Sequence, residues 1–239
     1  MSVTLEKMLQ SQGFGSRKLC RQLVLDGRIG IGGIICTDPG ISLETDSLVF
    51  QVDDEIWTYH DHLYLMLHKP AGYECSHRPQ HHPSVFSLFP SPFIRRGLQC
   101  VGRLDQDTTG LLLFSDDGCF IHRYTSPRKK IPKHYVVTTS GPVENGQLEQ
   151  LVNGVSLKDE SMPTSALTSR RLGEYRLGLV IAEGKYHQVK RMIAAAGNHV
   201  EKLHRVAIGG LTLADDLAPG QWRHLDGKDL KQLDILPEG

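Results

Sequence analysis

The sequence predicts an α+β protein with a small N-terminal module and a larger domain on a mostly antiparallel, mixed β-sheet. After residue 63, short strand-like apolar runs alternate with helical patches, separated by Gly, Pro and Asp turns. Their spacing lacks the regular strand–helix–strand alternation of a parallel sheet. Before residue 58, two short helical patterns lead into a glycine-turned hairpin. We therefore expect a module at residues 1–58, a linker at 59–62 and the larger domain at 63–239.

The composition is that of an ordinary globular protein. Of 239 residues, 39% are hydrophobic and 23% are charged, which suits a chain with a buried core. No apolar run approaches the roughly 20 residues of a membrane span. The N-terminus lacks the basic start and long apolar stretch of a signal peptide. We therefore expect a cytoplasmic protein without a membrane partner.

The five cysteines are scattered along the chain, and none belongs to a Cys-x-x-Cys pair. Separated cysteines in an odd number are atypical of a disulfide scaffold and of a thiolate zinc site. The His-rich stretch at residues 75–82 also matches no common zinc spacing, so a solvated loop is the better interpretation. We expect reduced thiols and no metal site.

Capping residues and glycines define the elements of the N-terminal module. Thr4 and Ser16 are each placed to cap a short helix. The paired glycines Gly32-Gly33 supply the positive φ angles of a tight hairpin turn. The expected elements are a helix after Thr4, a helix at 17–26, and strands at 28–31, 34–36 and 48–52.

Two short helices that lead into a hairpin resemble the alpha-L RNA-binding module, which is named for a small-subunit ribosomal protein. Basic side chains lie on the second helix and at the start of the hairpin. They are Arg17, Lys18, Arg21 and Arg28. The resemblance implies that these residues contact RNA.

The larger domain shows its clearest strand patterns at residues 63–67, 110–114, 135–139, 177–181 and 211–213. Helical patches lie at residues 118–124, 145–151 and 188–196. Within this domain, residues 102–114 combine a dense polar cluster with an apolar run. Arg103 and Asp105 lie in a glycine-bounded turn directly before the run, where a rigid strand can present them to a cleft. Asp105 there is either a nucleophile, base or metal ligand, or part of a surface turn.

The residues around this turn resemble the pseudouridine synthases. GRLDQDTTGLLLFSDDG at 102–118 is similar to the central motif of that family, and LHKPAGY at 67–73 to the strand end that precedes it. Downstream, KHY at 133–135 is similar to the Lys-x-Tyr element, and GKYHQVKRM at 184–192 to the motif that carries a basic residue. The four motifs occur in the order of the family.

The resemblance implies an enzyme that isomerises a uridine within RNA, without metal or cofactor. Asp105 falls on the catalytic aspartate, and Tyr135 on the tyrosine that faces the target base. Lys190 falls on the basic residue beside the aspartate, with Arg191 as the alternative for that contact. Lys69, Arg103 and Arg191 are further expected to contact RNA, Arg103 by filling the space of an extruded base or by holding a phosphate.

A basic strip precedes Tyr135. The whole chain has no net charge, with 27 Lys+Arg and 27 Asp+Glu, so composition alone does not indicate a nucleic-acid partner. Residues 123–133, however, hold five basic side chains and no acidic one. Together with the motifs, this predicts phosphate contacts. The strip residues expected to bind RNA are Arg128, Lys129, Lys130 and Lys133.

The last motif also indicates a branch of the family. Tyr186-His187-Gln188 stands where synthases of the large ribosomal subunit more often have Asn-Arg-Gln, so the resemblance favours small-subunit ribosomal RNA. We expect a monomer that acts on this RNA or on an assembling particle, with a large-subunit target as the alternative. Two other classes compete: a non-catalytic RNA-binding or ribosome-assembly factor, and an aspartyl phosphatase suggested by the Asp-x-Asp-x-Thr pattern of residues 105–109. The latter lacks a buried strand directly before Asp105.

Overall fold

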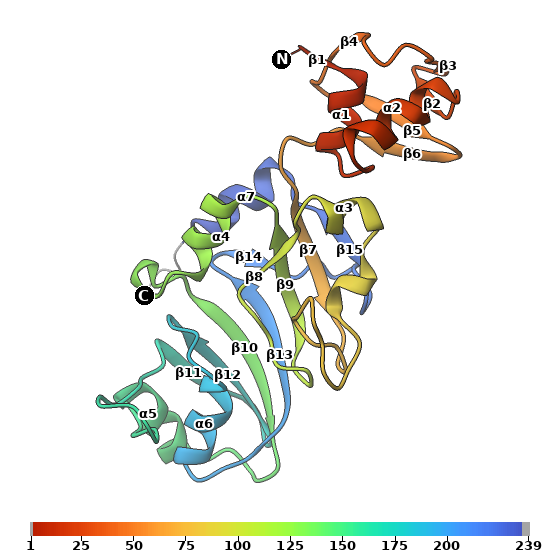
Figure 1. Cartoon of the computed structure of the whole chain (residues 1–239). Helices are drawn as coiled ribbons and strands as arrows, with labels where there is room; N and C mark the ends of the chain where they lie inside the picture. The colour runs from red at the N-terminus through yellow and green to blue at the C-terminus, as the bar shows by residue number, and fades with distance from the viewer. Residues whose placement is uncertain (1, 236–239) are drawn as a thin grey trace. The chain divides into compact units, whose positions relative to one another are not determined.

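The computed structural model describes residues 2–235 and divides into two compact units (Figure 1). One contains the chain up to Leu63 together with Phe89–Leu98, and the other contains Tyr64–Leu88 and the chain from Gln99 onward. Within the described residues, no helix is both long enough and apolar enough to cross a membrane.

The N-terminal unit packs two helices against a small antiparallel sheet. Its elements are β1 (Ser2–Thr4), α1 (Leu5–Ser11), α2 (Arg17–Leu25), β2 (Ile29–Ile31), β3 (Ile34–Ile35), β4 (Ser42–Glu44), β5 (Val49–Val52), β6 (Glu55–Thr58) and α3 (Ser91–Arg95). The sheet has the order β3-β2-β5-β6, and β1 pairs separately with β4. Leu9, Val24 and Phe50 belong to the buried cluster between the helices and the sheet.

The helix caps and the hairpin turn of this unit agree only in part with those predicted from the sequence. The Ser16 hydroxyl accepts a hydrogen bond from the Leu19 amide at 3.3 Å and so caps α2. Gly32 and Gly33 both have positive φ and turn the hairpin between β2 and β3. Thr4 occupies the N-cap position of α1, but its hydroxyl is buried and has no hydrogen-bond partner among residues 2–235. The prediction that Thr4 caps the first helix is therefore wrong.

A segment distant in sequence completes the N-terminal unit. Phe93 in α3 packs edge-on against Trp57, with the ring centroids 6.0 Å apart. Arg96 donates hydrogen bonds to the side chain of Gln12 and to the carbonyl of Asp61, each at 2.9 Å. The division of the sequence at residues 59–62 assigned residues 89–98 to the second part, because nothing local in that segment indicates where it packs.

The second unit is built on a nine-stranded sheet. Its strands are β7 (Tyr64–Lys69), β8 (Gln99–Val101), β9 (Thr109–Ser115), β10 (Lys133–Thr139), β11 (Thr168–Gly173), β12 (Arg176–Ile181), β13 (Val200–Ile208), β14 (Leu211–Thr212) and β15 (Trp222–His224). The order is β11-β12-β10-β13-β9-β7-β15, with β14 on β13 and β8 on β9. Among the strands of this sheet that the structure describes, only β13 and β9 pair in parallel, so the expected mixed, mostly antiparallel sheet is confirmed.

Strand β13 lies in the middle of this sheet, between β10 and β9, although the sequence predicted no strand there. Its sequence, VEKLHRVAI, has charged side chains among the apolar ones, so the pattern does not indicate a buried strand. At its contact with β9, Gly110 has a φ of +105°, and a Cβ atom there would lie 2.2 Å from the carbonyl oxygen of Arg205. Only glycine permits the two strands to approach so closely.

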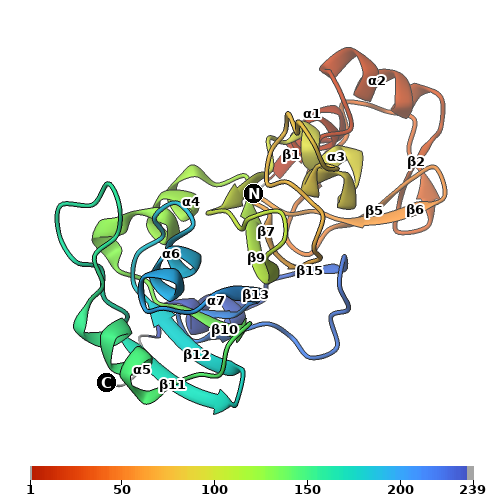
Figure 2. The same cartoon turned by 90° about the horizontal axis from the view of Figure 1, so that it is seen from below.

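Helices cover the sheet where its side chains are apolar. They are α4 (Gly118–Thr125), α5 (Asn145–Asn153), α6 (Gln188–Ala195) and α7 (Gly227–Leu233), with short 3-10 turns η1 (Val85–Leu88) and η2 (Pro127–Lys129). Phe120 and Tyr124 of α4 and Leu233 of α7 share a core with Leu111 and Leu113 of β9. Helices α5 and α6 lie beside β11 and β12, as Figures 1 and 2 show.

Candidate active site

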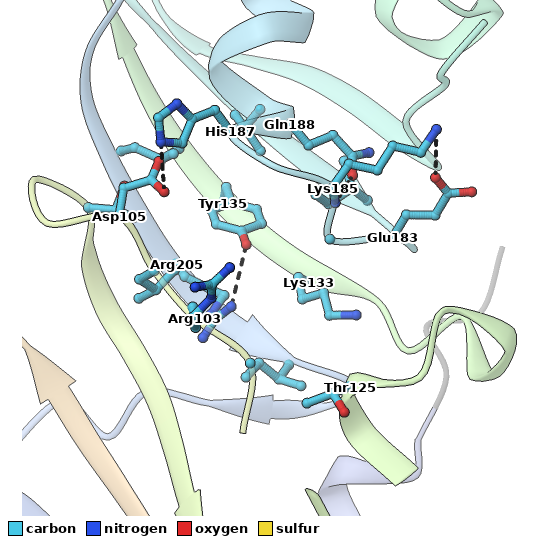
Figure 3. A pocket seen from close by; sticks show the side chains of 18 of the residues that line it. Arg103, Asp105, Thr125, Lys133, Tyr135, Glu183, Lys185, His187, Gln188 and Arg205 are labelled. Atoms are coloured by element: carbon cyan, nitrogen blue, oxygen red, sulfur yellow. Dashed lines mark hydrogen bonds and ion pairs between the residues drawn. The ribbon is translucent and has the colours of Figure 1, made fainter. Parts of the chain in front are cut away.

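A pocket of about 490 Å³ opens where the chain segments between strands meet. Its walls come from the loop between β8 and β9, from β10, from the segment that leads from β12 into α6, and from β13. These segments are far apart in sequence, and the sheet order brings them together. Of the predicted residues, the pocket gathers Arg103, Asp105, Lys133, Tyr135 and Lys190. Figure 3 labels the first four of them.

Asp105 lies between two basic side chains at the pocket wall. The Lys190 ammonium is 3.3 Å from Asp105 Oδ2, and His187 Nε2 is 3.4 Å from Oδ1. The Asp105 side chain keeps 28% of its surface exposed, so a substrate can still reach it. The geometry thus provides a carboxylate held from both sides.

Lys190 also binds Asp107, at 2.6 Å from Oδ1 and 2.8 Å from Oδ2. Burial alone would raise the pKa of Asp107, but the hydrogen bond and the charge of Lys190 hold this pKa below its usual value. Burial likewise opposes the charge of Lys190, while Asp107 and Asp105 raise the pKa of the ammonium above its usual value. One ammonium therefore fixes both carboxylates of the turn.

The contact left open between Lys190 and Arg191 is made by Lys190. Arg191 turns to a neighbouring loop, where its guanidinium donates to the carbonyls of Lys158 and Tyr186 and lies 3.8 Å from Glu160. These bonds join α6 to that loop. Contact of Arg191 with RNA stays a prediction.

Lys69 requires a correction. Its side chain is fully buried, and its ammonium donates hydrogen bonds to the carbonyls of Pro70, Gln106 and Thr108, at 3.0, 3.2 and 2.9 Å. Burial lowers the pKa of this lysine, although negative charges nearby oppose the shift. A buried ammonium cannot reach RNA, so the predicted contact is wrong. Lys69 instead holds the loop that carries Asp105.

His187 was not among the predicted site residues. It occupies the N-cap position of α6, and its backbone φ of +46° is unusual for a residue other than glycine. Its ring stacks on Tyr186, with centroids 3.8 Å apart and planes inclined by 20°. Its position inside the motif at 184–192 was the available signal. What sequence reasoning missed is that the left-handed turn aims the imidazole at Asp105.

Tyr135 and Arg205 line the pocket from neighbouring strands. Tyr135 of β10 pairs in register with Arg205 of β13, and the arginine Nη1 lies 3.5 Å from the tyrosine hydroxyl. Figure 3 shows the hydroxyl pointing toward the guanidinium. Both side chains are buried, with 8% and 3% of their surface exposed. Sequence reasoning missed Arg205, because a strand position cannot be assigned to a site before its neighbours in the sheet are known.

Lys133 lies in the wall of the same pocket and donates a hydrogen bond to the carbonyl of Ile131 at 2.8 Å. Burial, followed by the nearby charge of Arg205, lowers the pKa of Lys133 to about 8. This side of the pocket is therefore positively charged at neutral pH.

The remaining basic residues lie on surfaces. Arg103 is exposed at the pocket, and Arg128, Lys129 and Lys130 are exposed on and after η2, whose Pro127 lines the pocket. In the N-terminal unit Lys18 is exposed. Three arginines of that unit already have carboxylate partners: Arg17 and Arg21 lie 2.6 and 3.5 Å from Glu6, and Arg28 lies 2.6 Å from Asp53.

The His-rich stretch at residues 75–82 forms an ordered loop around a carboxylate. Glu74 accepts hydrogen bonds from the backbone amides of Gln80, His81 and His82, at 2.8 to 3.0 Å. The ring of His77 stacks on Phe86 at 3.6 Å. Between residues 2 and 235, no group of His, Cys, Asp and Glu has the geometry of a metal site.

The fold and the pocket define a class of enzyme that comparison with known proteins identifies. Residues 63–195 match the family described as RNA pseudouridylate synthase, and the chain belongs to this family. It is an RNA pseudouridine synthase, which excludes the aspartyl phosphatase and the non-catalytic factor.

Within the family, the chain is similar to the proteins called ribosomal small subunit pseudouridine synthase A. It is 39% identical to that of Escherichia coli (strain K12) over 226 residues, which cover 95% of this chain and 97% of the relative. It is 44% identical to that of Pasteurella multocida over 184 residues, covering 74% and 79%. A crystal structure of a pseudouridylate synthase superposes with a TM-score of 0.68 at 35% identity, covering 97% of this chain and 99% of the other.

Proposed function

We propose that this enzyme isomerises one uridine of small-subunit ribosomal RNA, with Asp105 as its catalytic carboxylate. The observation that carries the target is the similarity to small-subunit synthases along nearly the whole chain. The proposed role of Asp105 is supported by its position in the pocket, between Lys190 and His187. The substrate is either free RNA or an assembling particle that contains it.

The reaction breaks the bond between ribose C1′ and N1 of uracil, turns the base, and joins C1′ to C5. Asp105 acts at the ribose, and its contacts with Lys190 and His187 hold the carboxylate in place. The target nucleotide must leave its stack to enter the pocket, which costs a few kcal/mol. The Tyr135 ring recovers about 1–3 kcal/mol by stacking on the base. Exposed Arg103 fills the vacated space or holds the adjacent phosphate.

The target is tested in the organism that carries the gene. Small-subunit ribosomal RNA from a deletion strain, sequenced with chemistry that detects pseudouridine, should lack a single modification. Expression of the wild-type gene should restore it, and expression of the Asp105→Asn variant should not. An intact small-subunit profile, with a modification missing from large-subunit RNA instead, would contradict the proposed target.

The basic strip is proposed to bind RNA phosphates. Each neutralised phosphate adds about −0.7 to −0.9 to the slope of log K against log salt. Replacement of Arg128, Lys129 and Lys130 by Ala should therefore flatten the slope by roughly two to three units. The rate at saturating RNA should change little, since none of the three lines the pocket.

A matched variant replaces the exposed Arg170, Arg171 and Arg176 of β11 and β12, which removes the same charge from a part of the surface outside the pocket lining. Its slope should change less than that of the strip variant. Equal slopes for the two variants would show that the strip has no specific phosphate contacts and affects binding only through net charge.

A further inference from the structure

Arg205 carries a buried positive charge without a carboxylate partner. Only 3% of its surface is exposed, and none of the ion pairs formed within residues 2–235 includes it. Its Nε donates to the carbonyl of Leu111 at 2.8 Å, and Nη1 reaches the Tyr135 hydroxyl only at 3.5 Å. Nη2 is buried and has no hydrogen-bond partner among the described residues. The guanidinium therefore retains unused donor capacity at the pocket.

Such an arrangement is costly in the free enzyme. Buried charges are normally paired, and an unpaired one destabilises the folded protein. The structure gives Arg205 no ion pair, and among the charged residues that line the pocket with it, Lys133 is a second cation that its charge acts on. The charge of Arg205 contributes to the lowered pKa of that lysine, which shows that the two repel each other. An anion that arrives with the substrate would pair with the charge of Arg205 and reduce its repulsion with Lys133.

The position of Arg205 is rigid. Gly110 admits the backbone of Arg205 at the contact of β9 with β13, and the hydrogen bond to Leu111 fixes the side chain from the same strand. Its cross-strand partner in β10 is Tyr135. A fixed charge next to the residue that is proposed to face the base suits stabilisation of charge that appears only during reaction.

We infer that Arg205, assisted by Lys133, stabilises the negative charge that develops on uracil when its bond to ribose breaks. The electron pair of the C1′–N1 bond moves to N1 and is shared with O2 and O4 of the ring. While the base turns, the Asp105 carboxylate stabilises the electron-poor C1′. C5 then forms the new bond to C1′ and loses its proton, and N1 takes up a proton, so that the product is neutral and charge and atoms balance. This inference rests on the proposed roles of Asp105 and Tyr135.

A backbone phosphate is the other anion that RNA could supply. An extruded nucleotide enters a pocket with its base foremost, while its phosphates stay near the surface. The exposed Arg103 and the basic strip are placed for phosphates, whereas Arg205 lies at the depth of Tyr135. The structure therefore favours the base as its partner.

The test compares Arg205→Met and Arg205→Lys with the wild type in single-turnover reactions at saturating RNA. Arg205→Met should lower the rate about 10²- to 10³-fold, as does loss of one donor to a developing anion. Arg205→Lys should retain part of the rate, because it keeps the charge but loses the fork of donors. The Kd for RNA should change little in both variants, and exposed Arg176→Met serves as the control.

Folding provides an independent readout. Replacement of Arg205 removes an unpaired buried charge that destabilises the folded enzyme without RNA. The melting temperature of Arg205→Met should therefore stay level or rise. A large fall in melting temperature together with the loss of activity would assign Arg205 a structural role and overturn the inference. A raised Kd and a smaller salt slope with an unchanged saturating rate would assign it to phosphate, with the same consequence.

RNA with 5-fluorouridine at the target separates a role in the departure of the base from a general disturbance. Fluorine withdraws electrons and stabilises the departing uracil anion, so cleavage should depend less on Arg205. The ratio of wild-type to Arg205→Met rates, measured as loss of 5-fluorouridine in nuclease digests, should be several-fold smaller than with uridine. Equal ratios for the two substrates would overturn the inference. Activity of Asp105→Asn would contradict the proposed function itself, whereas a fully active Arg205→Met beside an inactive Asp105→Asn would remove only this inference.

Discussion

Asp105→Asn should abolish turnover while the enzyme still binds RNA. The substitution preserves size and removes the charge proposed to act at the ribose, so the rate should fall by about 10⁴-fold or more. The basic groups proposed to hold RNA phosphates are untouched, and the Kd should therefore remain close to that of the wild type. The measurement is a single-turnover assay at saturating RNA, with a separate binding titration.

Asp107→Asn is the matched control for this experiment. Asp107 lies two positions further along the same turn and also binds Lys190, but it is 54% exposed and does not line the pocket. Its loss should lower the rate far less than the loss of Asp105. If Asp105→Asn kept more than a small fraction of the wild-type rate, or if both variants were equally impaired, Asp105 would not be the catalytic carboxylate.

Lys69→Met should impair folding stability and catalysis together. The substitution leaves the carbonyls of Pro70, Gln106 and Thr108 without their donor, and the bond to Thr108 is buried. Each buried carbonyl that loses its donor lowers the free energy of unfolding by about 1–3 kcal/mol. Removal of the buried ammonium, which is itself costly to bury, offsets part of this loss. We expect the free energy of unfolding to decrease by about 3 kcal/mol. The rate should fall as well, because Asp105 loses the anchor of its loop.

Chemical denaturation measures the stability change, and hydrogen exchange of the amides at 105–108 reports whether the loop has loosened. Lys202→Met, an exposed substitution on β13, is the control and should leave both unchanged. Wild-type stability and exchange in Lys69→Met would show that the three hydrogen bonds do not hold the loop.

Local sequence determined most of the elements and the family. Apolar runs bounded by Gly, Pro and Asp predicted β7, β9, β10 and β12, because burial of a strand leaves a pattern in its own residues. Strand β13 escaped prediction since Glu201, Lys202 and Arg205 interrupt that pattern. The motifs placed Asp105, Tyr135 and Lys190 in a common site, and the pocket contains all three.

Tertiary structure decided which basic residues face the pocket, the loop or solvent. Sequence alone placed Lys69 with the RNA contacts and overlooked Arg205 and His187, although burial makes Lys69 an anchor and brings the other two to the pocket. The sequence also did not predict that Lys190, not Arg191, contacts Asp105. Nor did it predict that residues 89–98 belong to the N-terminal unit. The physical reason is common to all: periodicity reports whether a residue is buried within its own element, whereas its partners depend on the order in which distant strands pair.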